Sequence, residues 1–124
     1  MAIHESGEMY LETILILSQR MEHVRSIDVV KEMGFSKPSV SRAMSVLKKD
    51  AYLDIDSKGF ITLTDTGSAL AEKIYERHDI LTKALANMGV DEKIAAEDAC
   101  KIEHDISDES FAAIKKHVLK YSKE

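Results

Sequence analysis

The sequence has few of the residues that form disulfides, tight turns and aromatic cores: one cysteine, one proline, five glycines and no tryptophan in 124 residues. A single cysteine excludes a disulfide within the chain and is typical of a reducing compartment. Aromatic residues make up only 6%, which argues against a β-sandwich with aromatic-rich strands. With 44% hydrophobic residues and few turn formers, the composition favours a compact, mostly helical protein.

Long apolar runs are also missing. The longest, Ile14–Leu17, is far shorter than the roughly 20 residues that cross a bilayer. The first residues, Met1–Ser6, contain neither the basic nor the apolar segment of a secretion signal. We therefore expect a cytoplasmic protein with no membrane partner.

Positive charge is scarce overall but is concentrated in one place. The net charge is −5, from 17 basic and 22 acidic residues, which is unfavourable for a protein coated in nucleic acid. Residues 31–49 are the exception, with five basic side chains (Lys31, Lys37, Arg42, Lys48 and Lys49) against one acidic side chain, Glu32. This segment is therefore the first candidate for a contact with nucleic acid.

Hydrophobic spacing predicts six helices and one β-hairpin. Ser26, Ser36, Asp91 and Ser107 are the expected N-caps, because their side chains can accept hydrogen bonds from the first turn of a helix. The helices are expected over residues 3–22, 27–33, 37–50, 65–88, 92–105 and from 108 to near the C-terminus, and the hairpin strands over 52–56 and 60–64.

A short helix, a turn at Gly34, a second helix and a hairpin form the pattern of a winged helix-turn-helix. We assign this DNA-binding domain to residues 1–64. On the expected helix that follows Ser36, Val40, Met44 and Leu47 share one side, and the opposite side is small, hydroxylated and basic. Such a face suits the major groove. The candidate DNA-binding residues are Ser36, Lys37, Pro38, Ser39, Ser41, Arg42, Lys49 and, at the hairpin tip, Lys58.

One short reading helix contacts too few base pairs for useful specificity, so we expect a homodimer on palindromic double-stranded operator DNA. The helical second half, residues 65–124, offers more apolar surface than one reading head requires. We therefore interpret it as a dimerisation domain.

Three ligand-type residues, Cys100, Glu103 and His104, lie at i, i+3 and i+4 and are expected to share one helix face. Thiolate, carboxylate and imidazole together begin a transition-metal site. A lone cysteine is more often a small buried hydrophobe, but the expected apolar stripe of this helix lies on the other side, at Ile94, Ala95, Ala99, Ile102 and Ile106. A fourth ligand must come from elsewhere, and Met9 and Glu12 lie off the main apolar stripe of the first helix.

With these motifs the chain resembles the diphtheria toxin repressor family of metal-dependent transcriptional regulators. The resemblance covers almost the whole chain and is carried by Glu8–Ile14, Ser36–Arg42, Gly59 with Leu63–Gly67, Arg77–His78 and Cys100–His104. It implies a homodimer that binds operator DNA when a divalent metal occupies its site, so residues 65–124 are expected to be both the metal-binding and the dimerisation domain.

The resemblance also implies the ligands. The iron-type regulatory site falls on Met9, Cys100, Glu103 and His104, whereas the manganese-type branch has carboxylates at the first two of these positions. Glu12 and His78 match positions that the manganese-type branch uses for a paired-metal site. Two departures from the family are that Thr82 and Ala96 stand where the second iron-type site needs donors, and that the chain ends before an SH3-like domain.

Our hypothesis from the sequence is an iron(II)-responsive repressor of metal homeostasis genes. A manganese-responsive member of the family and a winged-helix repressor that senses an organic ligand stay open, and Co(II), Ni(II) and Zn(II) also suit the donors. An enzyme with Cys100 as nucleophile beside His104 is not expected, because nothing indicates an oxyanion hole. A winged helix that binds only protein conflicts with the basic reading face.

Overall fold

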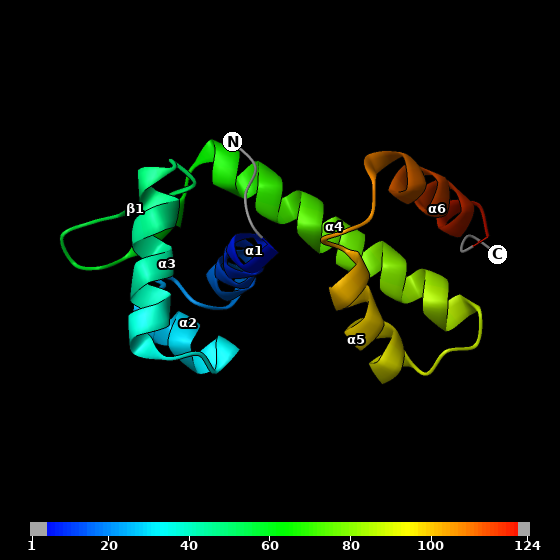
Figure 1. Cartoon of the computed structure of the whole chain (residues 1–124), viewed down its shortest axis with the longest axis horizontal. Helices are drawn as coiled ribbons and strands as arrows, with labels where there is room; N and C mark the ends of the chain where they lie inside the picture. Colours follow the sequence, from blue (N-terminus) through cyan, green and yellow to red (C-terminus); the bar gives the residue numbers. More distant parts are fainter. Residues whose placement is uncertain (1–4, 122–124) are drawn as a thin grey trace. The chain divides into compact units, whose positions relative to one another are not determined.

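The computed structural model describes residues 5–121, which form six helices and one two-stranded antiparallel sheet (Figure 1). Contacts divide the chain into two compact units, Met1–Glu72 and Lys73–Glu124, which we call unit 1 and unit 2. This mostly helical architecture with a short hairpin confirms the expected fold class. Within the described residues, no helix combines the length and the apolar character needed to cross a membrane.

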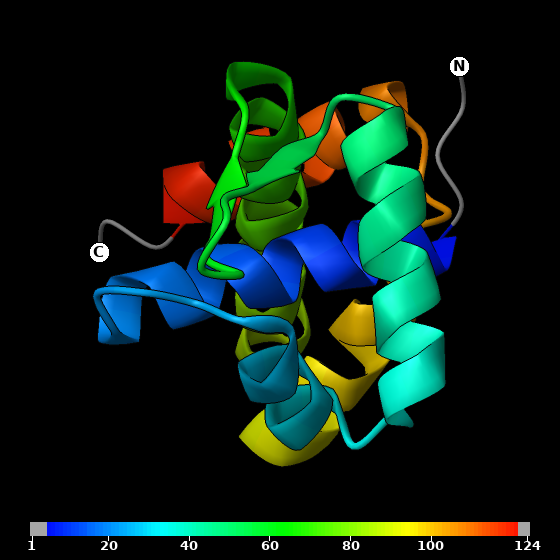
Figure 2. The same cartoon turned by 90° about the vertical axis from the view of Figure 1, so that its left-hand side faces the viewer.

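Unit 1 contains α1 (Glu5–Arg20), α2 (Ser26–Met33), α3 (Lys37–Lys49), β1 (Leu53–Ile55), β2 (Ile61–Leu63) and the start of α4 (Asp65–Asn87). Its core is apolar side chains from all of these elements, among them the fully buried Leu11, Ile14, Val29, Val40 and Leu53. Helix α1 contacts α2, α3 and β2 and runs crosswise to α3 (Figure 2).

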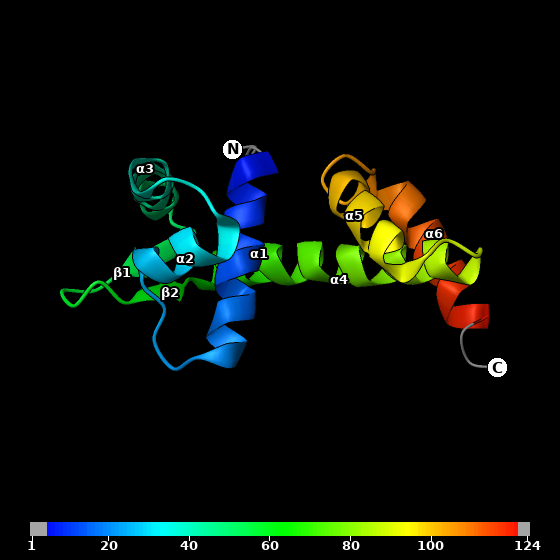
Figure 3. The same ribbon diagram turned by 90° about the horizontal axis from the view of Figure 1, so that it is seen from below.

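The expected hairpin is present, with Leu53 opposite Leu63 and Ile55 opposite Ile61. Val24 adds an isolated bridge to Ile61, so the segment before α2 lies along β2. The loop that joins the two strands extends away from the helices of unit 1 (Figures 1 and 3).

Two of the expected caps of unit 1 have different outcomes. The Ser36 side chain accepts a hydrogen bond from the Ser39 N–H, which confirms it as the N-cap of α3. Ser26 is not the N-cap of α2 but its first residue. Arg25 takes the cap position because the Asp28 carboxylate accepts a hydrogen bond from the Arg25 N–H at 2.9 Å. The predicted helix start at residue 3 lies outside the described residues.

Unit 2 contains the rest of α4, α5 (Glu92–Ile102) and α6 (Asp108–Tyr121). Ile80 of α4 packs with Phe111 and Val118 of α6 in a small core. Asp91 and Ser107 are the N-caps of α5 and α6, as expected, because Asp91 accepts from the Lys93 N–H and Ser107 from the Ser110 N–H.

Helix α5 ends at Ile102, three residues earlier than its predicted end at Asp105. The turn that follows is held by Arg77 of α4, whose guanidinium donates hydrogen bonds to the carbonyl oxygens of Glu103 at 3.2 Å and Ile106 at 2.8 Å. Carbonyl groups that the end of α5 leaves without helical partners are thus satisfied by a side chain from another helix. The predicted apolar stripe of α5 is also wrong in part, since Ile94 and Ile102 are exposed.

Asp108, the first residue of α6, completes this corner. Its carboxylate pairs with Arg77 and lies 3.0 Å from Lys73 Nζ. The Lys73 ammonium first, and then the Arg77 guanidinium, hold the pKa of the Asp108 carboxyl below its ordinary value. The two cations therefore tie α4 to the start of α6 at neutral pH.

Gly67, in the first turn of α4, lies against the backbone of Tyr52. A Cβ atom at this position would meet the Tyr52 carbonyl oxygen at 1.9 Å. Thr64 holds the approach, since its N–H donates to the Tyr52 oxygen at 3.1 Å and its hydroxyl donates to the Ala51 oxygen at 2.7 Å. The hairpin and the start of α4 thus meet at a position where only glycine fits.

We predict that Gly67→Ala lowers the free energy of unfolding by about 1–3 kcal/mol, as overpacking against a fixed backbone does. Urea denaturation measures the change. Gly34→Ala is the matched control, because Gly34 has a φ of +71° but nothing within 4 Å of its added Cβ. It should lose only the backbone strain, about 1 kcal/mol. A Gly67→Ala protein as stable as wild type would contradict the close approach.

We also predict that Asp108→Asn destabilises the protein more at neutral pH than in acid. A depressed carboxyl pKa stabilises the folded state above its unfolded-state pKa of about 4, and this contribution disappears as the pH falls through the folded-state value. Urea denaturation at pH 7, 5 and 3 tests this. The effect should shrink in a Lys73→Met background, which removes one of the two cations. If Asp108→Asn lowers the free energy of unfolding by the same amount at every pH, no charge pair is involved.

Candidate metal centre and nucleic-acid interface

Three of the predicted ligands meet in unit 2 where α5 ends. Glu103 is the C-cap of α5, and its side chain is 0% exposed. Its Oε2 atom lies 2.9 Å from Nδ1 of His78 on α4, and its Oε1 atom lies 3.4 Å from Nε2 of His104. The carboxylate is therefore placed between two imidazoles from different parts of the unit.

This arrangement fits a divalent cation. A buried carboxylate is costly unless hydrogen bonds or opposite charge compensate for its lost hydration. The Glu103 Oε1 atom accepts no hydrogen bond from the part of the chain that the structure describes. Carboxylate oxygen and imidazole nitrogen together are a donor set for transition metals. The residues present at this end of α5 therefore fit a bound metal ion.

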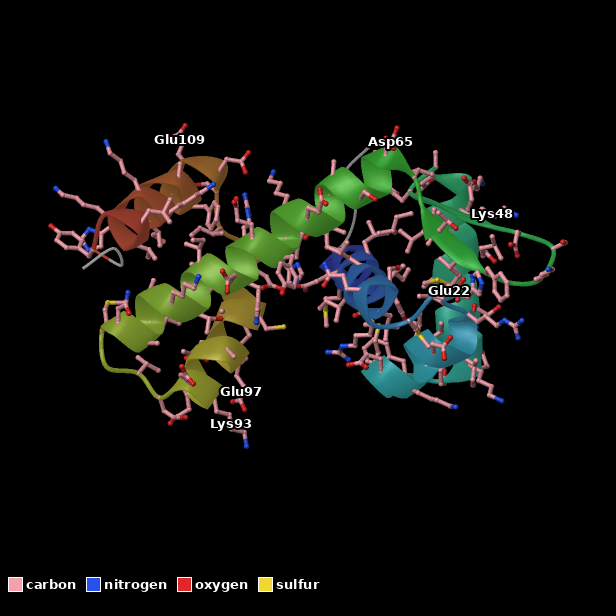
Figure 4. The ribbon with its side chains drawn as sticks, turned by 180° about the vertical axis from the view of Figure 1, so that it is seen from behind. Glu22, Lys48, Asp65, Lys93, Glu97 and Glu109 are labelled. Carbon is pink, nitrogen blue, oxygen red and sulfur yellow. The ribbon has the colours of Figure 1, made fainter. Side chains whose placement is uncertain are left out.

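The other predicted ligands lie on two helices. Cys100 is half-buried in the last turn of α5, just before Glu103. Lys93 and Glu97 of the same helix are exposed and point away from α4 (Figure 4). Met9 and Glu12 are half-buried on α1 in unit 1 and are three residues apart, so they lie on neighbouring positions of one helix surface.

Cys100, Glu103 and His104 are predicted to share one face of a single helix, but only the first of them lies within α5. Cys100 belongs to α5, but Glu103 is its cap and His104 lies in the turn that follows. The Glu103 N–H still donates to the Ala99 oxygen at 2.9 Å and the Ile106 N–H to the Ile102 oxygen at 3.0 Å, so some helical hydrogen bonds continue into the turn beyond α5. His104 is thus held by the corner and not by a regular helix.

The candidate reading helix α3 has the two sides that the sequence predicts. Val40, Met44 and Leu47 are buried in the core of unit 1. The opposite side carries the predicted DNA-binding residues, of which Ser36, Lys37, Pro38, Ser41, Arg42 and Lys49 are exposed and Ser39 is half-buried. Lys48, labelled in Figure 4, adds a further cation at the C-terminal end of this helix.

The loop of the hairpin is ordered by Asp56. Its carboxylate accepts hydrogen bonds from the N–H groups of Phe60 and Lys58, each at 2.9 Å. These bonds, chiefly that of Phe60, keep the pKa of the Asp56 carboxyl below its usual range. Lys58 is exposed next to this bonded turn. Lys58, the residue of the hairpin that we predict to contact DNA, is therefore an exposed cation on a hydrogen-bonded loop.

Arg25 makes a contact with the hairpin that sequence reasoning missed. Its guanidinium lies 4.7 Å from the centre of the Phe60 ring, and the His23 ring stacks on the same phenyl group at 4.2 Å. Both residues flank Val24, which pairs with β2. No local sequence signal shows this pairing, because it joins residues that are far apart in the chain.

Unit 2 also has an apolar groove. It has a volume of about 580 Å³ and is lined by side chains from all three helices of the unit, including Leu85, Met88, Ile102, Ile114 and Tyr121. Met88 is 73% exposed and Tyr121 is 52% exposed. Apolar surface of this kind is typical of a contact with another protein or with an apolar ligand.

Two regions of the chain match known protein families. Residues 2–60 match the family described as "Iron dependent repressor, N-terminal DNA binding domain". Residues 64–123 match "Iron dependent repressor, metal binding and dimerisation domain". Together these matches cover nearly the whole chain.

Individual relatives agree with this. The chain is 31% identical over 119 residues to an uncharacterized HTH-type transcriptional regulator of Methanocaldococcus jannaschii, covering 94% of this chain and 95% of that protein. It is 31% identical over 102 residues to the HTH-type transcriptional regulator MntR of Lysinibacillus sphaericus, covering 82% of this chain and 73% of MntR.

Among solved structures, the manganese regulator SloR matches with a TM-score of 0.81 and 28% identity over 98% of this chain. The match covers 55% of the SloR chain, so this chain spans about half its length. The two matched regions and the relatives lead to the same conclusion: the chain belongs to the iron-dependent repressor family of metal-dependent DNA-binding transcriptional regulators, and not to a family of enzymes.

Proposed function

We propose that this protein is a metal-responsive transcriptional repressor that binds palindromic operator DNA as a homodimer and controls metal homeostasis genes. The observation that supports this most is the buried Glu103 carboxylate between His78 and His104. It lies within the residues that match a metal-binding and dimerisation domain. The basic, hydroxylated face of α3 supports the DNA half of the proposal.

We assign the metal ligands to both units. In unit 2, the Glu103 carboxylate and the imidazoles of His78 and His104 would hold the ion, with Cys100 as a thiolate. In unit 1, Met9 and Glu12 on α1 would complete the set. A bound ion would supply the positive charge that the buried carboxylate needs and would join the DNA-binding unit to the dimerising one. A coupling of about 1–3 kcal/mol is usual for such a link.

Two lines of support point to different metals. SloR is described as a manganese regulator, which favours manganese(II) over our expectation of iron(II). Met9 and Cys100 are sulfur donors, and sulfur donors favour iron(II), cobalt(II), nickel(II) or zinc(II) over manganese(II). Cys100 is therefore the residue that decides between the two branches.

We predict that Cys100→Ala weakens cobalt(II) and iron(II) binding at least about tenfold and manganese(II) binding less, because only the softer ions depend on the thiolate. Competition with a fluorescent chelator under anaerobic conditions measures the affinities. The cobalt(II) complex of the wild type should also show a thiolate charge-transfer band that the variant lacks. Glu97→Ala, on the exposed side of α5, is the control. Equal affinities in wild type and Cys100→Ala for every metal would remove Cys100 from the site.

For DNA, we predict different effects from the helix and the wing. Arg42→Ala should cost about 1–3 kcal/mol and relax base preference, because an arginine in the major groove reads a base edge. Lys58→Ala should weaken all sequences alike and lower the salt slope by about one, because it contacts phosphate. Anisotropy titrations with an in vitro selected duplex and a scrambled one separate the two effects. Lys93→Ala in unit 2 should change neither. Unchanged preference in Arg42→Ala would exclude α3 as the reading helix.

We place the homodimer contact at the apolar groove of unit 2, and we predict that Met88→Glu converts the dimer to a monomer, because a charge there must lose its hydration in the interface. Sedimentation velocity measures the oligomeric state, and circular dichroism checks the fold. Val46→Glu is the control, since Val46 is an exposed apolar residue of α3 in unit 1. A wild type that is monomeric would leave the groove to a small apolar ligand, as in the organic-effector alternative.

A further inference from the structure

Arg77 is buried next to the proposed metal ligands without being one of them. It is 5% exposed and belongs to the same turn of α4 as His78. Its Nη1 atom donates to the backbone carbonyl oxygen of Glu103 at 3.2 Å and to that of Ile106 at 2.8 Å. Its Nη2 atom pairs with the Asp108 carboxylate. One side chain thus contacts the start, the middle and the end of the corner between α5 and α6.

We propose that Arg77 is a positioning residue for the metal ligands: it fixes the corner that carries Glu103 and His104 so that both face His78. This inference rests on the proposed metal site and deepens it. These contacts of Arg77 are all made to atoms of this chain.

The corner needs such a residue because its backbone is only partly held by helical hydrogen bonds. Helix α5 ends at Ile102, and His104 lies in the turn beyond it. Carbonyl groups at a helix end have no partners within the helix and must be satisfied from outside. Arg77, the residue adjacent to His78, supplies such a bond to the carbonyl oxygen of Glu103, the C-cap of α5, and a second bond to the carbonyl oxygen of Ile106 at the end of the turn. The backbone of Glu103 is therefore held by Arg77, and the next residue of α4, His78, provides the imidazole that faces the Glu103 carboxylate.

Arginine suits this place better than other cations. Its planar guanidinium presents several donors in fixed directions, whereas a lysine ammonium is a single point charge on a flexible stem. A cation at the C-terminal end of α5 and an acidic residue at the start of α6 both match the dipoles of their helices. The Phe111 ring, 5.4 Å from the guanidinium carbon, covers the group.

Stability alone does not account for the arrangement. The Arg77 Nε atom is buried and donates no hydrogen bond within the described residues. Its ion-pair partner Asp108 has a side chain that is 75% exposed, and ion pairs with an exposed partner usually add little to stability. The bonds that Arg77 makes instead define one geometry for the corner, which is what a preorganised ligand set requires.

The test compares Arg77→Met and Arg77→Lys with a control of similar thermal stability, Ile80→Ala, which removes core packing between α4 and α6 but leaves every hydrogen bond between Arg77 and the corner in place. Metal-free proteins are first melted by circular dichroism. Manganese(II) and cobalt(II) affinities are then measured at a temperature at which every variant is folded, and the ligand-field spectrum of cobalt(II) is recorded.

We expect Arg77→Met to bind both metals about 10–100-fold more weakly, the usual loss when a residue that orients ligands is removed. Ile80→Ala should bind them like wild type. Arg77→Lys should lie between wild type and Arg77→Met in affinity, and its cobalt(II) spectrum should differ from that of wild type. If Arg77→Met does not fold, Arg77→Lys carries the comparison with Ile80→Ala.

Affinities and cobalt(II) spectra that match those of Ile80→Ala would reduce Arg77 to a structural residue and overturn the inference, while the metal site itself would stand. A wild type that binds neither metal would instead overturn the proposed function. The two failures are therefore distinguishable in one set of titrations.

Discussion

The buried carboxylate of Glu103 is the constraint on which unit 2 depends. A carboxylate removed from water needs positive charge or several hydrogen bonds, and here it has an imidazole on either side, from His78 and His104. The helix that carries it ends beside it, and Arg77 together with Asp108 holds the corner that follows. Burial, chain reversal and ligand geometry are thus parts of one arrangement, which a divalent cation would complete.

The two units differ in the kind of side chain that each exposes or buries. Unit 1 places hydroxyl and basic groups on the exposed side of α3 and a cation at the tip of the hairpin, as contact with phosphate and base edges requires. Unit 2 holds the buried carboxylate and an apolar groove. The net negative charge of the whole chain therefore conceals a basic surface on one unit. We propose that metal binding and DNA binding are coupled because ligands from both units hold the metal.

Much of this architecture follows from local sequence signals. The order of elements, the caps at Ser36, Asp91 and Ser107, and the two sides of α3 depend on residues close together in the chain. What local patterns miss is decided by tertiary contacts. Arg77 bonds the carbonyl at the end of α5 from a distance of 26 residues, and the contact of Arg25 with Phe60 depends on the pairing of Val24 with β2. Family motifs indicated the candidate ligand residues, but the hydrogen bonds from Arg77 to the backbone of the corner that carries Glu103 and His104 appear only in the structure.

The central claim is that metal controls DNA binding, and a gel-shift titration of operator DNA tests it most directly. Wild-type protein is titrated onto a selected palindromic duplex with a chelator, with manganese(II) and, under anaerobic conditions, with iron(II). We predict tight, sequence-specific binding with at least one of the two metals and only weak, salt-sensitive binding with the chelator. Equal operator affinity in all three conditions would contradict it.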